Sequence, residues 1–322
     1  MKKENQSSVQ EFILLGFPTA LKEVQILLFL IFLPIYMLTL VENVVIVVMV
    51  QVSYPLHKPM YLFLSSLSFL EIWYITITVP KMLFDLLRGN QHISFLGCKA
   101  QLYFFIALAF TECVLLAVMV YDRCVAICIP LRYPAIMTHG LCFCLVAGSW
   151  VSGFTSSMVK VIFISHLTFC DSVINHFFCD ISPLLNLACT DMSLVERVDF
   201  ILALIMILLP LLLVVVASYA CIVATVAGIP TAQGRRKAFS TCTSHLVVVI
   251  IFYSTTLFTY ARPRAMYAFD SNKLVSMLYT VIVPFFNPII YCLRNQDVKK
   301  ALRKINRGRS KPENNVSGSQ ID

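Results

Sequence analysis

The sequence predicts an all-α integral membrane protein, a bundle of seven transmembrane helices with its N-terminus outside the cell and a short amphipathic eighth helix. Of the 322 residues, 59% are hydrophobic and only 13% are charged, whereas about a quarter of an average soluble domain is charged. The apolar residues also gather in long blocks, and a helix that crosses a bilayer needs about 20 of them. Together these two observations exclude an ordinary soluble domain.

Seven blocks reach the required length, near residues 24–50, 59–83, 99–121, 141–165, 198–226, 238–261 and 273–293. Helices are expected because lipid offers the backbone no hydrogen-bond partners, and a transmembrane barrel would show short alternating segments instead. Pro80 interrupts the second block, and Pro284 and Pro288 interrupt the seventh. Membrane helices tolerate such prolines when neighbouring groups satisfy the freed carbonyls.

The distribution of charge sets the orientation of the bundle. With the N-terminus outside, 14 of the 25 basic residues lie on the cytosolic side with four acidic residues, and the outer side has 11 basic and ten acidic residues. Since Lys and Arg concentrate in cytosolic loops, this orientation is favoured over its inverse. The net charge of +8 is therefore a topology signal. We expect no nucleic acid partner, because the basic residues form no aromatic-interleaved surface on a soluble module.

We expect one domain in three parts: an extracellular segment (1–23), the bundle (24–293) and a cytoplasmic tail (294–322). Asn5 begins a glycosylation sequon on the outer side. After residue 294, apolar residues recur at helical spacing among basic ones, a pattern that suits a helix lying on the anionic inner leaflet. The longest connection, 166–197, lies outside and is expected to form a lid over the bundle.

Four of the twelve cysteines lie in expected extracellular positions, namely Cys98, Cys170, Cys179 and Cys189. An even number in an oxidising compartment suggests two disulfides, and spacing alone does not choose among the three pairings. A Cys98–Cys179 bridge would pin the lid to the third helix, and a Cys170–Cys189 bridge would close the lid on itself; these are the pairs we expect. The alternative is a metal site around His176, but a disulfide-bonded Cys179 is not a thiolate ligand, so we expect no metal.

Five segments resemble the odorant (olfactory) receptors, a branch of the rhodopsin-like G-protein-coupled receptors. They are Pro59–Leu64, Met119–Cys128, Ser218–Tyr219, Lys237–Leu246 and Pro284–Tyr291. The resemblance runs from about Glu11 to Arg303, and the segment Lys237–Leu246 is similar to odorant receptors and unlike other rhodopsin-like receptors.

The chain departs from the family's pattern at four positions. Glu42 stands where Gly usually precedes the Asn of the first helix, and Glu71 stands where Asp is usual. Cys124 replaces the common Tyr after Asp-Arg, and Ser254 replaces a frequent Gly. Glu42 is the most unusual, since a charged group in a membrane helix is costly unless it is neutral or faces the interior.

The resemblance implies a receptor and not an enzyme. Such a receptor binds small volatile molecules in the outer half of the bundle and raises cyclic AMP through a stimulatory heterotrimeric G protein. It would be located in the plasma membrane, in the cilia of olfactory sensory neurons. The ligand-binding residues that the resemblance implies are Phe105, Ile106, Ala109, Phe110, Ala203, Ile207, Tyr253, Thr256, Tyr260, Tyr279 and Thr280, with Tyr260 as the preferred polar anchor.

The resemblance also implies an activation switch, in which Arg123 is restrained at rest and released when the sixth helix moves. The switch residues are Asp122, Arg123, Tyr219, His245, Asn287, Pro288 and Tyr291. Glu71 and Glu112 are intramembrane acids and are therefore functional candidates in their own right. Two carboxylates in one cavity of low dielectric would share a proton or bind a cation, and the resemblance places both at an interior sodium site. A neutral, hydrogen-bonded acid is the alternative, and we expect no other cofactor.

Three other classes of function fit less well. A rhodopsin-like receptor for a lipid or peptide commonly has a Trp-containing motif in the sixth helix, where this chain has Phe252 and Tyr253. A transporter would show inverted repeats and paired broken helices. In an intramembrane enzyme, Ser240, His245 and Asp122 would need the spacing of a nucleophile, base and orienting group, which they lack. The composition of the pocket does not identify the ligand, because one methylene group in an apolar pocket changes the binding affinity by only about 1–3 kcal/mol.

Overall fold

The computed structural model describes residues 10–17, 22–89, 91–260, 273 and 276–294, and within these ranges it does not describe the side chains of 237–241, 244, 258–260 and 291–294. The expected glycosylation site at Asn5 and the expected amphipathic helix of the tail lie outside the described residues. In chain order the elements are β1 (Glu11–Leu14), α1 (Lys22–Val52), η1 (Tyr54–Leu56), α2 (Pro59–Arg88), β2 (His92–Ser94), α3 (Phe95–Cys128), α4 (Tyr133–Ile136), α5 (His139–Ser165), β3 (Val173–Ile174), α6 (Ile181–Leu185), α7 (Ser193–Ala203), η2 (Leu204–Leu208), η3 (Pro210–Val216), α8 (Ala217–Ala227), α9 (Ala232–Tyr260), η5 (Leu278–Ile282) and α11 (Val283–Arg294).

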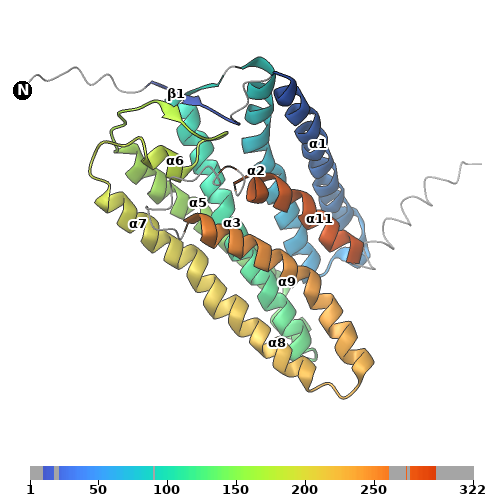
Figure 1. Ribbon diagram of the computed structural model, residues 1–322. Coiled ribbons are helices and arrows are strands. Elements are labelled where there is room, and N and C mark those ends of the chain that lie inside the picture. The colour runs from blue at the N-terminus through green and yellow to red at the C-terminus, as the bar shows by residue number, and fades with distance from the viewer. Residues whose placement is uncertain (1–9, 18–21, 90, 261–272, 274–275, 295–322) are drawn as a thin grey trace, which may run out of the picture.

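Five helical spans among the described residues are long and apolar enough to cross a bilayer. They are α1, α2, α3, α5 and the continuous span Ser193–Ala227, which joins α7, η2, η3 and α8. Shorter apolar stretches occupy the expected sixth and seventh positions, at His245–Leu257 in α9 and Leu278–Ile290 in η5 and α11. The predicted seven-helix bundle is thus confirmed. Figure 1 shows the helices running between one end that carries β1 and α6, which we call the outer end, and an inner end where α8 and α9 meet.

The central helix of the bundle is α3. Its most apolar window is 83% buried, whereas that of α1 is 11% buried. Contacts connect α3 to α2, α5, α8 and α9. In contrast, α1 exposes Ile26, Leu30 and Val41 among other large apolar side chains. Such exposure suits a helix that faces lipid, because lipid tails are as apolar as these side chains.

The close approach of α3 and α5 depends on a glycine. A Cβ atom at Gly153 would lie 2.1 Å from Thr111 Oγ1 and 2.6 Å from the carbonyl oxygen of Ala107, both on α3. One turn further along α5, the hydroxyl of Ser157 donates to the carbonyl of Tyr103 over 2.6 Å. Small residues therefore let the two helices pack backbone to backbone, as is common in membrane bundles.

A small β-sheet covers part of the outer end, and the sequence did not predict it. β1 is the central strand: it pairs antiparallel with β2 and parallel with β3, which lies in the long outer loop. The side chains of Phe12 and Leu14 in β1 are each 1% exposed, while the side chain of Glu11 in the same strand is exposed to solvent. The segment before the first membrane helix is therefore a packed part of the fold, and its alternation of buried and exposed positions was the available signal.

Two disulfides hold the outer loop. Cys98, at the start of α3, is joined to Cys179, with the Cα atoms 5.5 Å apart, and Cys170 is joined to Cys189. These are the pairs expected from the sequence. The backbone amide of Cys179 also donates to Gln101 Oε1 on α3 over 2.9 Å, so the loop is fixed to α3 by both a covalent and a hydrogen bond.

The apolar interior is divided at the inner end. One large cluster of buried side chains extends through the bundle and reaches Leu56 and Met137 in the inner loops. A separate small cluster consists of Ile222, Val226 and Cys242, from α8 and α9. The inner ends of these two helices therefore pack through a contact that is distinct from the main core.

Candidate functional site

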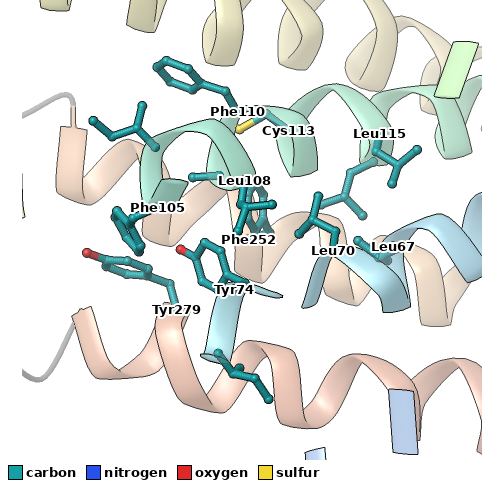
Figure 2. Close-up of a cluster of buried hydrophobic side chains, with 14 of the residues drawn as sticks. Leu67, Leu70, Tyr74, Phe105, Leu108, Phe110, Cys113, Leu115, Phe252 and Tyr279 are labelled. Atoms are coloured by element: carbon teal, nitrogen blue, oxygen red, sulfur yellow. The ribbon is translucent and has the colours of Figure 1, made fainter. Parts of the chain in front are cut away.

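An aromatic cluster lies in the outer half of the bundle around Phe105. Its ring stacks against Tyr74 of α2 with the ring centroids 5.2 Å apart. The centroids of Phe178, from the outer loop, and Tyr279, from η5, lie 4.8 and 6.0 Å away. Figure 2 shows Phe105, Tyr74 and Tyr279 facing one another. The second, third and seventh spans and the lid thus meet at one buried side chain.

A polar link joins the lid to the seventh span beside this cluster. The hydroxyl of Tyr279 donates to Asp180 Oδ2 over 3.2 Å and lies 3.1 Å from Ser276 Oγ. Asp180 also accepts a hydrogen bond from the amide of Ile181 over 2.7 Å. Burial raises the pKa of the Asp180 carboxyl, and these two hydrogen bonds act in the opposite direction. The link is a buried Tyr–Asp bond between two segments that are distant in sequence.

The remaining ligand candidates lie in or beside the same core. Ile106, Ala109 and Ile207 are buried in the main apolar cluster, and the half-buried Ala203 packs against that cluster. The hydroxyl of Tyr253 donates to the carbonyl of Cys113 on α3 over 2.7 Å, which ties the sixth span to the third.

Three of the expected ligand-binding residues have hydroxyl groups: Thr256, Thr280 and Tyr260. Thr256 and Thr280 are buried, and their hydroxyls donate to carbonyls of their own helices, those of Phe252 and Ser276. Tyr260 is the last residue of α9, and its side chain lies outside the described part of the chain. Its proposed role as an anchor is therefore untested.

Phe110 lies on a different face of α3 from Phe105, and Figure 2 shows it pointing away from Tyr279. Its ring centroid is 5.5 Å from the ammonium group of Lys160 on α5. Lys160 forms an ion pair with Asp199 of α7 and its side chain is only 2% exposed. The charges of both residues also act on Asp180.

Sequence reasoning missed this ion pair, because Lys160 and Asp199 were counted among the outer-loop charges. Lys160 nevertheless lies inside the fourth apolar block, and a charge within a membrane span is a functional candidate by default. The ion pair places a buried ammonium group and a carboxylate beside the ring of Phe110 in the outer half of the bundle.

The two interior acids lie deeper in the bundle. Glu71 is 1% exposed and accepts a 2.6 Å hydrogen bond from the side-chain amide of Asn287 in α11. Glu112 is 2% exposed and interacts electrostatically with Glu71. One Glu112 carboxyl oxygen has no hydrogen-bond partner among the described atoms. A proton or a cation is the kind of species that would satisfy such an atom.

The inner end of α3 carries the first part of the expected switch. Asp122 is 2% exposed, and its carboxylate accepts a 2.8 Å hydrogen bond from the hydroxyl of Tyr133 in α4. Burial and this bond raise the pKa of the Tyr133 hydroxyl. Sequence reasoning did not assign a role to Tyr133, although it lies in the segment that follows Asp122 and Arg123, and its hydroxyl bonds Asp122 from the second inner loop.

The second part of the expected switch joins α8 to α9. The hydroxyl of Tyr219 lies 3.3 Å from Nδ1 of His245, and the charge of Arg123 acts on both residues. Beside them is an apolar groove of about 220 Å³ lined by Tyr219, Ile222, Val223, Val226, Ala227, Cys242, Thr243 and Leu246. Asn287 and Pro288 are buried in α11, and the side chain of Tyr291 lies outside the described part of the chain.

Within the described residues, no group of three or more His, Cys, Asp or Glu side chains is placed to hold a metal ion. In particular, Cys179 beside His176 is in a disulfide. His176 instead stacks on Phe177 with the ring centroids 4.7 Å apart, and its Nδ1 accepts from the amide of Phe178.

The chain is similar to a large group of known proteins. Residues 32–308 match a family model described as olfactory receptor. Human olfactory receptor 6P1 is 59% identical over 310 residues, which cover 96% of this chain and 97% of that protein. Mouse olfactory receptor 6B9 is 60% identical over 94% of this chain and 95% of its own length. Rat olfactory receptor 226 is 58% identical over 94% of both chains. Squid rhodopsin has a similar fold, with a TM-score of 0.69 over 91% of this chain and 88% of its own, at 15% identity.

Proposed function

Because this chain belongs to the olfactory receptor family, we propose that it binds small volatile molecules in the outer half of its bundle and activates a stimulatory heterotrimeric G protein that raises cyclic AMP. Membership in the family makes it a multi-pass receptor of the plasma membrane and not an enzyme. Its location in the cilia of olfactory sensory neurons is part of the proposal.

The observation that carries the proposal is the separation of two kinds of site along one bundle. The aromatic cluster around Phe105 lies at the outer end, while the Tyr219–His245 pair and its groove lie at the inner end. Both involve α3, directly or through the charge of Arg123. A ligand that alters packing at one end of a central helix can bias a two-state contact at the other.

The ligand site consists of the residues expected from the sequence, from Phe105 to Thr280, with the Lys160–Asp199 pair beside them. Pockets for small molecules are mostly apolar with a few polar groups that fix orientation, and this composition fits small volatile ligands. Tyr260 supplies a hydroxyl anchor from the sixth span. Agonist potencies that are all the same in Tyr260→Phe as in the parent receptor would remove that residue from the site.

The signalling site consists of Asp122, Arg123, Tyr219, His245, Asn287, Pro288 and Tyr291. When α9 moves away from α8, the groove between them widens and accepts the C-terminal helix of the G protein as an amphipathic helix in a groove. Arg123→Ala is expected to abolish cyclic AMP production while ligand binding remains. Normal second-messenger output at equal surface expression would contradict this role for Arg123.

The interior acids Glu71 and Glu112 regulate this transition by holding a shared proton or a sodium ion. The unpartnered oxygen of Glu112 and the Asn287 bond to Glu71 support a site that binds one small cation or proton. If sodium is bound, agonist potency depends on sodium concentration and Glu112→Gln removes the dependence. If potency is independent of sodium in the parent receptor and unchanged in the variant, the proton alternative stands instead.

The whole proposal is tested by expressing the receptor with a cyclic AMP reporter and screening a library of volatile compounds against vector-only cells. At least one compound should give a concentration-dependent response that Arg123→Ala abolishes. A receptor that reaches the surface, binds a volatile compound and yet never changes cyclic AMP would refute coupling to a stimulatory G protein.

A further inference from the structure

A cavity at the inner end has no part in the ligand or switch sites. It has a volume of about 220 Å³ and lies where the first inner loop meets the starts of α2 and α5. The lining residues are Val50, Gln51, Leu56, His57, Lys58, Pro59, Leu62 and His139. The stretch 50–62 and the distant residue His139 therefore form one hollow at the inner end.

The lining of this cavity has two chemically different parts. Val50 and Leu56 are buried, with 7% and 1% of their surfaces exposed, and together with Leu62 they form an apolar floor. His57, Lys58 and His139 are exposed and form a basic rim. The ring of His57 is held by a 3.2 Å contact between Nε2 and the carbonyl oxygen of Gln51. None of the lining residues is acidic, and the three rim residues are all basic.

Two long helices begin at this cavity. α2 starts at Pro59 and α5 starts at His139, and the N-terminal end of a helix carries a partial positive charge that favours anions. The N-terminus of α2 has no side-chain cap, and Lys58 occupies the capping position. The backbone thus adds positive potential to the charge of Lys58 at the same rim.

The cavity lies at the loop that joins two membrane-spanning helices, α1 and α2, where the inner leaflet's headgroups are expected. The adjoining Tyr54 is 85% exposed, and exposed tyrosines collect at membrane–water interfaces. The inner leaflet is anionic and attracts basic residues near its surface. We propose that this cavity binds an anionic phospholipid, with the headgroup phosphate at the rim formed by His57, Lys58 and His139 and the glycerol and first acyl carbons over the floor.

The apolar floor favours a lipid over a free phosphate ion. A free phosphate would use only the basic rim and would leave Val50, Leu56 and Leu62 facing water. A phospholipid can use both parts of the cavity, because its phosphate can bind the basic rim while its attached acyl chains cover the apolar floor.

The test uses the full-length receptor in phosphatidylcholine nanodiscs, with short-chain phosphatidylinositol 4,5-bisphosphate as the probe and native mass spectrometry as the measure of bound lipid. Lys58→Ala is expected to weaken binding about fivefold, the factor that corresponds to the contribution of one basic residue near an anionic lipid. Removing the three rim side chains together should abolish binding. Arg132→Ala is the matched control, because Arg132 is an exposed basic residue on the same side that does not line the cavity.

Three outcomes would overturn the proposal. Equal weakening by Lys58→Ala and Arg132→Ala would show a general attraction to the basic surface. Competition by soluble inositol trisphosphate as strong as that by the lipid would show that the floor is not used. Failure of the parent receptor to prefer the anionic probe over phosphatidylcholine would show that there is no site. If Lys58→Ala does not fold, His139→Ala provides the same comparison from an exposed position on another helix.

Discussion

The outer and inner ends of this receptor are held together by different kinds of bond. At the outer end, two disulfides, a three-stranded sheet and the Tyr279–Asp180 bond connect the lid, the first residues of the chain and the bundle. In addition, the ammonium group of Lys273 donates to the carbonyl of Gly16 over 2.7 Å. At the inner end, the described residues show no disulfide, and the links there include the side-chain hydrogen bonds Tyr133–Asp122, Tyr219–His245 and Thr225–Cys128 and a small apolar cluster.

This difference indicates which end can change shape. A disulfide fixes the lid on α3 and strand pairing fixes it on β1, so the proposed ligand site at Phe105 lies beside a covalently held frame. Side-chain hydrogen bonds such as these contribute about 0.5–3 kcal/mol each, which is the scale that ligand binding can overcome. The outer end is therefore suited to recognition and the inner end to movement.

The largest effect is expected from breaking the covalent frame. Cys98→Ser removes the bridge between α3 and the lid, which should lower the free energy of unfolding by about 2–4 kcal/mol and remove most receptor from the cell surface. Surface labelling and thermal unfolding measure the change. Cys144→Ser is the control, since Cys144 is an exposed free cysteine on α5. A Cys98→Ser receptor with normal surface level and stability would show that the outer end is held by its noncovalent contacts.

A matched pair of variants compares the two ends with the same chemistry. Tyr279→Phe and Tyr133→Phe each remove one hydroxyl that donates to an aspartate, over 3.2 Å at the outer end and 2.8 Å at the inner end. A hydrogen bond to a charged group contributes about 1.5–3 kcal/mol. We expect Tyr279→Phe to weaken agonist potency and Tyr133→Phe to lower the maximal cyclic AMP response at unchanged potency. If both variants changed only potency, the division of roles between the ends would be wrong.

Acid should loosen the outer end. His176 is 1% exposed, and burial together with the charge of Lys273 lowers the pKa of its imidazole from 6.5 to about 3. Between these values the unfolded chain binds a proton that the folded chain does not, so the free energy of unfolding falls as pH falls, by up to about 1.4 kcal/mol per unit. Above about pH 6.5 the group has no effect on the pH dependence.

The measurement is the thermal unfolding midpoint at about pH 7.5 and about pH 5. His176→Phe keeps an aromatic ring next to Phe177 and cannot titrate, so the difference between the two midpoints should shrink. His166→Phe is the control, because His166 is exposed at the end of α5. An unchanged pH dependence in His176→Phe would mean that other groups set the acid stability of the lid.

The smallest effect is expected from Tyr219→Phe. It removes the hydroxyl that lies 3.3 Å from His245 Nδ1, and one neutral hydrogen bond contributes about 0.5–1.5 kcal/mol. The concentration–response curve should therefore shift by about tenfold or less, without a change in surface level. The direction of the shift shows whether the pair stabilises the resting or the active arrangement, and no shift would exclude it from the switch.

Particular residues show where sequence reasoning succeeded. The apolar blocks predicted the helices, because the backbone groups of a span in lipid must form their hydrogen bonds within that span. Glu71 and Glu112 were identifiable as interior groups because a carboxyl in an apolar block is conspicuous, and both are buried. The four outer cysteines could be assigned to the extracellular side from their positions, although spacing alone left the pairing open.

Other features depended on contacts that no local pattern records. β1 has only four residues, and its pairing partners lie in two segments about 80 and 160 positions further along the chain. Lys160 and Asp199 could each be read as loop charges until α5 and α7 brought them together. Likewise Tyr133 gained a role only when α4 folded back against the end of α3.

The sequence by itself determined the class of this protein, its number of spans and its family, because hydrophobicity and short motifs are properties of adjacent residues. The tertiary structure decided which polar groups lie inside the bundle, which of them are paired and how the two ends are held. Those properties depend on distances between residues far apart in the chain, and such distances are set only when the helices pack.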